Sequence, residues 1–352
     1  MFCWKKFCPK KFRPAMELLR FSAATALSVC AFGFCVCVRP QSSSQEQTPT
    51  IRVRVDRVNV GVIVTDRSGK FVEGLRREDF RILDNGVEQA ISDFLPIAEP
   101  AQVLFLVESG PAVVFLSKNH FLAAETLLNS LAPTDRVAIA SYSKDPELLL
   151  DFTPDKPTAR RALEGLNFMA GFGDLNLASS LASAIDWLAA LPGKKTIVAL
   201  STGIDTSPAS KWPLIEQKLE TSDVRILAVS LSGDFRKPIK HKVLSRQEKE
   251  GRAFVEHGFA AADQALRKLS RVTGGRVYFP KNQKDFDRAY AEIAQLVRHE
   301  YSLAFTPPAR DGRLHTIEVK VSGFGRRVNH RQAYLAPAET KAQDSSPRSV
   351  TP

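Results

Sequence analysis

Residues 103–112 read VLFLVESGPA, an unbroken apolar run that ends in a polar turn. A continuous run of this kind, without polar alternation, is typical of a strand buried on both faces of a parallel sheet. Similar runs recur at 136–143 (RVAIASYS), 196–201 (TIVALS) and 224–230 (VRILAVS), and segments with helical periodicity separate them. Strand–helix alternation over 101–300 therefore predicts a doubly wound α/β domain with a mainly parallel sheet covered by helices on both faces.

The segments on either side of this domain have strand patterns. In residues 53–98, valines recur at every second position from Val58 to Val64, and Asn85-Gly86 predicts a tight hairpin because both turn positions need positive φ. Residues 301–336 include TIEVKV, in which apolar and polar side chains alternate. Neither segment has enough strands to be stable alone. We therefore expect the two to pair into one small β module, into which the α/β domain is inserted.

The first 38 residues indicate export. Residues 1–20 are basic, residues 21–38 form an uncharged and largely apolar run, and a polar linker follows over 39–52. This order is that of a secretory signal peptide. The run is also long enough for an uncleaved membrane anchor. The expected location is the periplasm or the cell exterior, with cleavage or anchoring left open, as is the choice of Met1 or Met16 as the start.

Composition excludes several other classes of protein. The chain has 352 residues, of which 44% are hydrophobic and 25% charged, which are ordinary globular values. Its net charge of +11 comes mostly from residues 1–47 and from a basic loop at 236–252, so it does not form a basic face. Aromatic residues do not interleave with that loop, and we expect no nucleic-acid partner. The polar tail, residues 337–352, is predicted to be disordered.

Catalytic signatures are missing from the sequence. All five cysteines lie within the first 38 residues, so the folded region has no thiolate metal site and no cysteine nucleophile. The chain contains no Walker loop, no G-x-S-x-G elbow and no H-E-x-x-H motif. We therefore predict no catalytic residues and a protein that is not an enzyme.

The order of motifs resembles the von Willebrand factor A-related domain family described from acidobacteria. The resemblance covers about residues 53–336 and rests on VNVGVIVTDRSGKFVEGLRREDFRILDNGVEQAISDF, VLFLVESGPA, DRVAIASYS, IVALSTGIDTS, GGRVYFP, YSLAFTPPARDGRLHTIEVKV and RQAYLAP. It implies a divalent-cation site at the carboxyl ends of the strands. The ligands there come from an Asp-x-Ser-x-Ser turn, a Thr in a second loop and an Asp in a third.

The chain departs from that ligand pattern. The five corresponding positions hold Glu108, Gly110, Ala112, Leu175 and Thr202. Mg²⁺ needs convergent oxygen ligands, whereas Gly110, Ala112 and Leu175 have no side-chain oxygen. We therefore predict a degenerate site that binds no metal, and a protein without a cofactor.

Three carboxylates are candidate residual ligands. Glu108, Asp174 and Asp205 could build a rearranged site for Mg²⁺ or Ca²⁺, although nothing in their spacing requires one. The alternative interpretation is that Glu108 caps or hydrogen-bonds its own loop.

The basic loop offers a candidate partner-binding set. Arg236, Lys237, Lys240 and Lys242 follow the strand at 224–230 and so emerge where open α/β sheets bind ligands. One hypothesis is that they supply fixed positive charge in place of the ion and attract an acidic protein. The alternative is a solvated loop with no dedicated partner.

The function that we expect is an exported, non-catalytic module for protein–protein interaction or adhesion that works without a metal ion. Membrane contact is expected only through the N-terminal segment. A membrane-anchored scaffold component of an envelope complex and a cryptic hydrolase are the alternatives.

Overall fold

The structure of the chain is a computed structural model. It describes residues 57–110, 117–166, 173–206, 212–234, 236 and 245–338. The proposed signal or anchor segment, the polar linker and nearly all of the predicted tail lie outside these residues. Within the described part of the chain, no helix is both long enough and apolar enough to cross a membrane.

The α/β domain contains a six-stranded sheet with the order β10-β9-β8-β5-β6-β7, in which β7 alone is antiparallel. Its strands are β5 (Ala101–Glu108), β6 (Arg136–Tyr142), β7 (Pro146–Thr153), β8 (Lys194–Ser201), β9 (Arg225–Ser230) and β10 (Arg276–Tyr278). Every residue of β5, β8 and β9 is buried. Burial on both faces explains why these strands have continuous rather than alternating apolar sequences.

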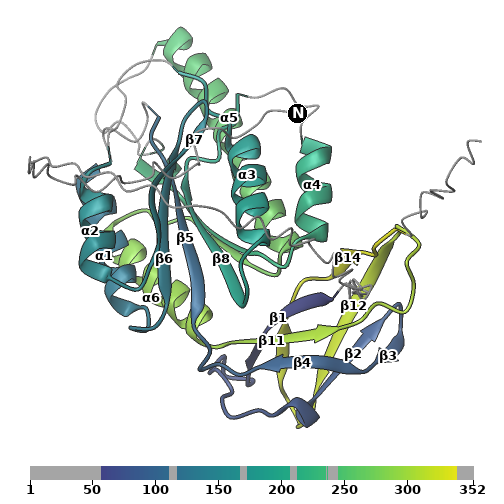
Figure 1. The fold of residues 1–352 in the computed structure, drawn as a ribbon. Helices are drawn as coiled ribbons and strands as arrows, with labels where there is room; N and C mark the ends of the chain where they lie inside the picture. The colour runs from purple at the N-terminus through teal and green to yellow at the C-terminus, as the bar shows by residue number, and fades with distance from the viewer. Residues whose placement is uncertain are drawn as a thin grey trace, which may run out of the picture. The chain divides into compact units, whose positions relative to one another are not determined.

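Among the described residues, helices α1 to α6 cover the two faces of this sheet (Figure 1). They are α1 (Ser117–Ser130), α2 (Lys156–Glu164), α3 (Leu177–Ala189), α4 (Trp212–Thr221), α5 (Arg246–Val272) and α6 (Gln283–Arg298). One apolar core joins α1, α2 and α6 to the face that carries Phe105, and a second joins α3, α4 and α5 to the face that carries Leu104. The predicted doubly wound α/β fold is confirmed.

Helix α5 is longer than the sequence pattern indicated. Part of the basic segment that we interpreted as a loop, from Arg246 onward, is the first two turns of this helix. Arg, Lys, Glu and Gln are good helix formers. Arg246 and Glu250 also make a one-turn ion pair of 2.9 Å, which adds modestly to helix stability. The interpretation of residues 246–252 as part of a loop was therefore wrong.

The flanking segments pair with each other, but they form two sheets. Their strands are β1 (Val58–Thr65), β2 (Phe80–Asp84), β3 (Val87–Gln89), β4 (Ile91–Leu95), β11 (Glu300–Phe305), β12 (Leu314–Val321), β13 (Arg327–Asn329) and β14 (Ala333–Leu335). The sheets have the orders β13-β1-β11-β4 and β14-β12-β2-β3, and they enclose a common apolar core. The expected hairpin joins β2 to β3, with positive φ at Asn85 and Gly86.

Strand β1 is shared between the two parts of the fold. Its valines face the core of the β module, whereas Ile63 packs into the core of the α/β domain. On the same face, the Asn59 amide donates a 2.9 Å hydrogen bond to Asp223. Lys194, the first residue of β8 in the α/β domain, donates a 2.9 Å hydrogen bond from its ammonium to the carbonyl of Ile97 in the flanking β segment. The β module therefore packs against the amino ends of the parallel strands, and their carboxyl ends are left for other contacts.

Candidate functional site

Glu108 is the last residue of β5, and its side chain is completely buried. Its Oε2 accepts a 2.7 Å hydrogen bond from the backbone N–H of Thr202, the residue after β8. The Thr202 hydroxyl donates to the same carboxylate, 3.0 Å from Oε1. These bonds tie the first loop at the carboxyl end of the sheet to the third.

Two further side chains complete a buried polar network, the Glu108 cluster, defined as Glu108, Tyr142, Ser201 and Thr202. The Tyr142 hydroxyl donates to Ser201 Oγ at 2.6 Å, and the Ser201 hydroxyl donates to Glu108 Oε2 at 3.2 Å. Burial raises the pKa of Glu108, and the hydrogen bonds from Thr202, Tyr142 and Ser201 oppose that shift. Burial, together with the nearby Glu108 charge, raises the pKa of the Tyr142 phenol well above its ordinary value.

The second loop fills the remaining space with an apolar side chain. Leu175 is 6% exposed and packs on Gly110, where an added Cβ would lie 2.5 Å from Leu175 Cδ2. A serine at position 110 would therefore need this leucine to move. Mg²⁺ needs convergent oxygen ligands, and neither Gly110 nor Leu175 has a side-chain oxygen.

The second and third loops are also hydrogen-bonded to each other. The Thr206 backbone N–H donates to the Leu175 carbonyl at 2.7 Å, and the Leu175 N–H donates to Thr206 Oγ1 at 2.8 Å. Asp205 Oδ2 accepts a 2.6 Å bond from the Ala178 N–H, in the first turn of α3. A carboxylate suits the positive end of a helix dipole. Asp205 therefore anchors the start of α3, and hydrogen bonds link the second and third loops.

The three candidate metal ligands have different surroundings. Glu108 is buried in its cluster, Asp205 binds the start of α3, and Asp174 is exposed. Within the described ranges, no three His, Cys, Asp or Glu side chains come together in a way that could hold a metal ion. The interpretation that Glu108 hydrogen-bonds its own loop needs one correction. Its shortest hydrogen bond comes from Thr202, which follows the neighbouring strand β8. Ala112 lies outside the described residues.

Of the basic candidates, Arg236 is described and contacts its own chain. Its Nη1 donates a 2.7 Å bond to Asp263, and its Nε lies 3.7 Å from a Glu256 oxygen. Its guanidinium also lies over the Phe259 ring, 5.4 Å from the ring centre. All three partners belong to α5, so Arg236 itself is bound to that helix. Lys237, Lys240 and Lys242 lie outside the described residues.

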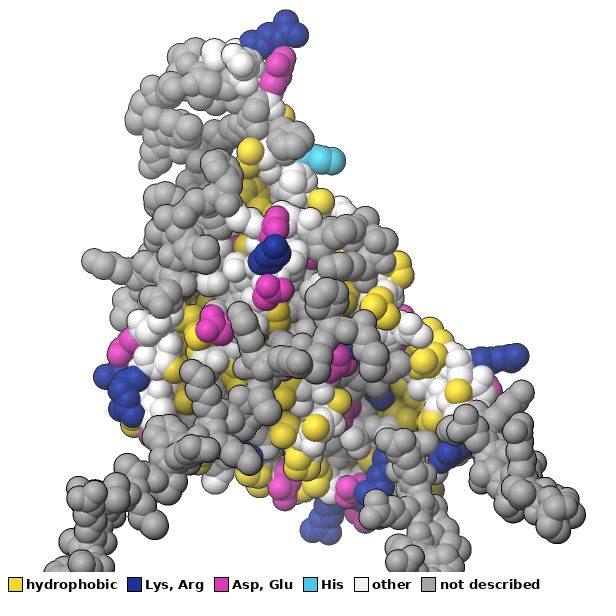
Figure 2. Space-filling model, turned by 45° about the horizontal axis from the view of Figure 1, so that its top comes forward, with side chains coloured by type: hydrophobic (Ala, Val, Ile, Leu, Met, Phe, Trp, Pro, Cys, Tyr) yellow, Lys and Arg dark blue, Asp and Glu magenta, His cyan; other side chains and the backbone are white. Residues whose placement is uncertain are grey.

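Figure 2 brings the top of Figure 1 forward and shows the surface around this end of the sheet. Among the described side chains in view, hydrophobic residues lie between single acidic and basic ones, without a patch of one charge. Sequence reasoning missed Tyr142 and Ser201. Tyr142 ends the apolar strand β6, and Ser201 ends the apolar strand β8. A polar residue at the end of an apolar strand was the signal by which the sequence could have indicated both.

A family model described as the von Willebrand factor type A domain matches residues 120–204. This segment of the chain is similar to domains of that family. The matched segment includes Leu175 and Thr202, whereas Glu108 and Gly110 precede it. No curated protein sequence matches the chain.

Solved structures with a similar arrangement have low sequence identity. An aerotolerance-related membrane protein from Bacteroides fragilis is 13% identical, covers 56% of this chain and 98% of its own, and has a TM-score of 0.40. A von Willebrand factor type A protein from Catenulispora acidiphila is 9% identical, with 82% and 76% coverage and a TM-score of 0.41. The PilB minor pilin from Streptococcus sanguinis is 12% identical, with 58% and 63% coverage and a TM-score of 0.39.

Proposed function

We propose that this protein is a non-catalytic module that binds a protein partner without a metal ion, through the carboxyl end of its von Willebrand factor type A domain. Domains of this type are generally interaction modules. The observation that carries the proposal is the Glu108 cluster, which uses protein donors where the resemblance places an ion. Its carboxylate accepts bonds from Thr202 and Ser201, so little of its coordinating capacity is left.

The hydrogen bonds between loops support a site that is already formed before a partner arrives. Thr202 joins the first and third loops through Glu108, and Thr206 joins the third to the second through Leu175. A surface held in one arrangement loses less conformational entropy on binding than a mobile one. Partner binding would therefore depend on shape and on polar contacts at this end of the sheet, not on an open coordination position.

Location and charge complete the proposal. Residues 1–38 would direct the chain out of the cytoplasm, and retention of 21–38 would leave it anchored to the membrane. The basic segment 236–252, which includes the first turns of α5, has a net charge of +5, and this charge favours an acidic partner by electrostatic attraction. An anchored chain of this kind would act as a scaffold component of the envelope, with the same binding surface.

The test is capture of a partner from an envelope extract of the source cells, with the tagged protein as bait in EDTA and again in Mg²⁺. Asp174→Arg changes an exposed side chain at the carboxyl end of the sheet. Asp93→Arg is the matched control, because it makes the same charge change on exposed β4 of the β module. We expect one partner to bind equally in both buffers, to be lost with Asp174→Arg and to be kept with Asp93→Arg. EDTA-sensitive capture would contradict metal independence, and binding by Asp174→Arg would contradict the proposed surface.

A further inference from the structure

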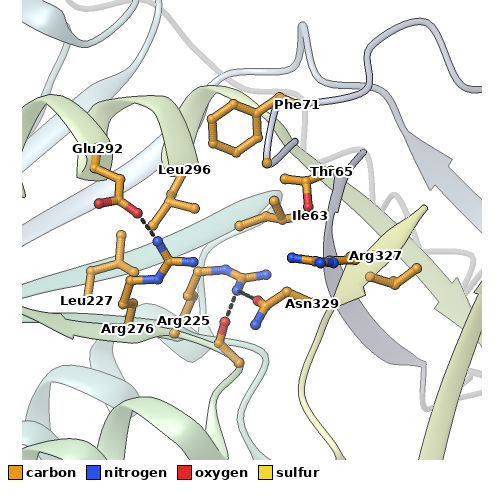
Figure 3. A pocket seen from close by; sticks show the side chains of 14 residues that line it. Ile63, Thr65, Phe71, Arg225, Leu227, Arg276, Glu292, Leu296, Arg327 and Asn329 are labelled. Atoms are coloured by element: carbon orange, nitrogen blue, oxygen red, sulfur yellow. Dashed lines mark hydrogen bonds and ion pairs between the residues drawn. The ribbon is translucent and has the colours of Figure 1, made fainter. Parts of the chain in front are cut away.

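A pocket of about 560 Å³ lies between the β module and the α/β domain (Figure 3). Strands β1 and β13 line it from the module, and β9, β10 and α6 line it from the domain. It lies at the amino ends of β9 and β10, whereas the Glu108 cluster lies at the carboxyl ends. Its volume is in the range of small-ligand sites, which often form between domains. Nothing in the proposed partner surface depends on this pocket.

One side of the pocket is apolar. Ile63, Phe71, Leu227 and Leu296 are its apolar lining residues, and Figure 3 shows Phe71 and Ile63 on the side opposite Arg225 and Arg276. Ile63, Leu227 and Leu296 belong to the core of the α/β domain. Phe71 stacks on the His299 ring, with the ring centres 4.4 Å apart. This wall is therefore fixed in place, and a ligand could bury apolar surface against it.

Three arginines line the opposite side. Arg225 is buried, and its Nε forms a 2.5 Å ion pair with Glu300. Its Nη1 also donates a 2.9 Å hydrogen bond to the Asn329 amide oxygen. Arg276 is ion-paired with Glu292. Each of these two guanidinium groups therefore has a carboxylate that balances its charge.

Arg327 differs from the other two. It lies on β13, and its side chain extends into the pocket toward Arg225 and Asn329 (Figure 3). Within the described part of the chain, no carboxylate lies within ion-pair distance of Arg327, although Arg225 and Arg276 each have one. Arg327 is exposed on β13, and it leaves one positive charge of the pocket without a carboxylate partner among the described residues.

We infer that this pocket binds a carboxylate that carries an apolar group, either a small organic acid or the free C-terminus of a peptide. A guanidinium matches a carboxylate in geometry and can donate two parallel hydrogen bonds to it. Arg327 would supply these bonds, and the wall formed by Ile63, Phe71 and Leu296 would take the apolar group. A single excess charge suits a monoanion.

The test measures binding to the full chain by calorimetry with two matched pairs of probes. Hexanoate is compared with hexanamide, and a short peptide that ends in leucine is compared in its acid and amide forms. Arg327→Gln removes the charge, and Arg327→Lys keeps it without the planar fork. Arg81→Gln is the control, because Arg81 is an exposed arginine of β2 outside the pocket.

We expect the acid of at least one pair to bind about tenfold or more tightly than its neutral partner. Arg327→Gln should weaken the binding of that acid by about the same factor. The affinity of Arg327→Lys for the acid should lie between those of the original chain and Arg327→Gln. The affinity of Arg81→Gln should equal that of the original chain. Tighter binding of the peptide acid than of hexanoate would identify a protein terminus as the ligand. Tighter binding of hexanoate than of the peptide acid would identify a small organic acid as the ligand. Equal binding of acids and neutral partners, no saturable binding of either acid, or acid binding unchanged by Arg327→Gln would overturn the inference. If Arg327→Gln does not fold, the comparison of acid with neutral probe on the unaltered chain decides.

Discussion

The carboxylate of Glu108, at the end of β5, accepts a 2.7 Å hydrogen bond from the backbone N–H of Thr202, just after β8. Both residues are completely buried. A backbone donor to a buried carboxylate is a strong, charge-assisted interaction. It links the first and third loops at the carboxyl end of the sheet.

Divalent cations should not stabilise the folded chain. A site filled at 100 times its dissociation constant would add about 2.7 kcal/mol to the free energy of unfolding. For a chain of this size, that is a rise in Tm of several degrees. We expect the same Tm in EDTA and in millimolar Mg²⁺, Mn²⁺ or Ca²⁺, measured by calorimetry. A rise with one ion would mean that Glu108, Asp174 and Asp205 rearrange to bind it.

Glu108→Gln should change how stability depends on pH. Because burial raises the pKa of Glu108 in the folded chain, the stability that it contributes is present at low pH and is lost as pH rises from about 4.5 through the folded pKa. The glutamine does not titrate, so the variant should gain stability relative to the original chain as pH rises. Urea unfolding at a series of pH values measures this, with exposed Glu88→Gln as the control. Parallel curves for Glu108→Gln and the original chain would contradict it.

Glu108→Ala should destabilise the chain at every pH. It leaves the Thr202 N–H and the Ser201 hydroxyl buried without their acceptor, at a cost of about 1–3 kcal/mol for each unsatisfied group. The midpoint of urea unfolding measures the loss. A loss below about 0.5 kcal/mol, the range of ordinary surface substitutions, would show that the cluster contributes little.

Gly110 and Leu175 should be energetically coupled. Gly110→Ser places a Cβ against Leu175 Cδ2 and should cost about 1–3 kcal/mol by overpacking. Leu175→Ala alone should cost about 2–5 kcal/mol through the cavity that it leaves. The double variant should be less destabilised than the two single losses together, by about 0.5–3 kcal/mol. A double-mutant cycle by urea unfolding measures the coupling, and strict additivity would contradict the contact.

The Arg225–Glu300 ion pair should be important for the junction between the two parts of the fold. Glu300→Ala leaves the Arg225 guanidinium buried without its carboxylate and should cost about 3–5 kcal/mol. Gly61→Ala should also be destabilising, because its Cβ would lie 2.3 Å from Glu300 Oε1. The exposed control, Glu88→Ala, should cost no more than about 1 kcal/mol. Equal losses for Glu300→Ala and Glu88→Ala would contradict this role.

His315 should make the β module more stable at acidic pH. Burial lowers its pKa, but hydrogen bonds and charges from Asp84 and Asp311 outweigh burial and raise the pKa above 6.5. Its contribution is therefore fully present below about pH 6.5 and is lost as pH rises through the folded pKa. His315→Gln should remove this loss, so its Tm should fall less than that of the original chain from about pH 6 to about pH 8.

His330 provides the control for that measurement. Burial lowers its pKa, so its contribution is present above about pH 6.5 and is lost as pH falls through the folded pKa. His330→Gln should therefore change the pH dependence of Tm in the opposite direction to His315→Gln. Shifts of the same sign in both variants would contradict the assignment of the two histidines.

The sequence by itself determined the α/β class, the strand pattern of the flanks and the hairpin at Asn85-Gly86. These features depend on local periodicity and on the backbone freedom of a few turn residues, which can be read along the chain. The loss of the oxygen ligands at Gly110 and Leu175 was also readable, because residue type alone decides whether a side chain carries an oxygen.

Only the tertiary structure decided which side chains surround Glu108 and where the junction between the β module and the α/β domain lies. Glu108, Tyr142, Ser201 and Thr202 come from three strands, so their bonds exist only once β5, β6 and β8 are paired. At Gly61 of β1, the Arg225–Glu300 pair leaves no room for a Cβ. Such contacts join residues that are far apart in sequence. Their strength and position depend on packing that excludes water, and no local sequence pattern encodes that packing.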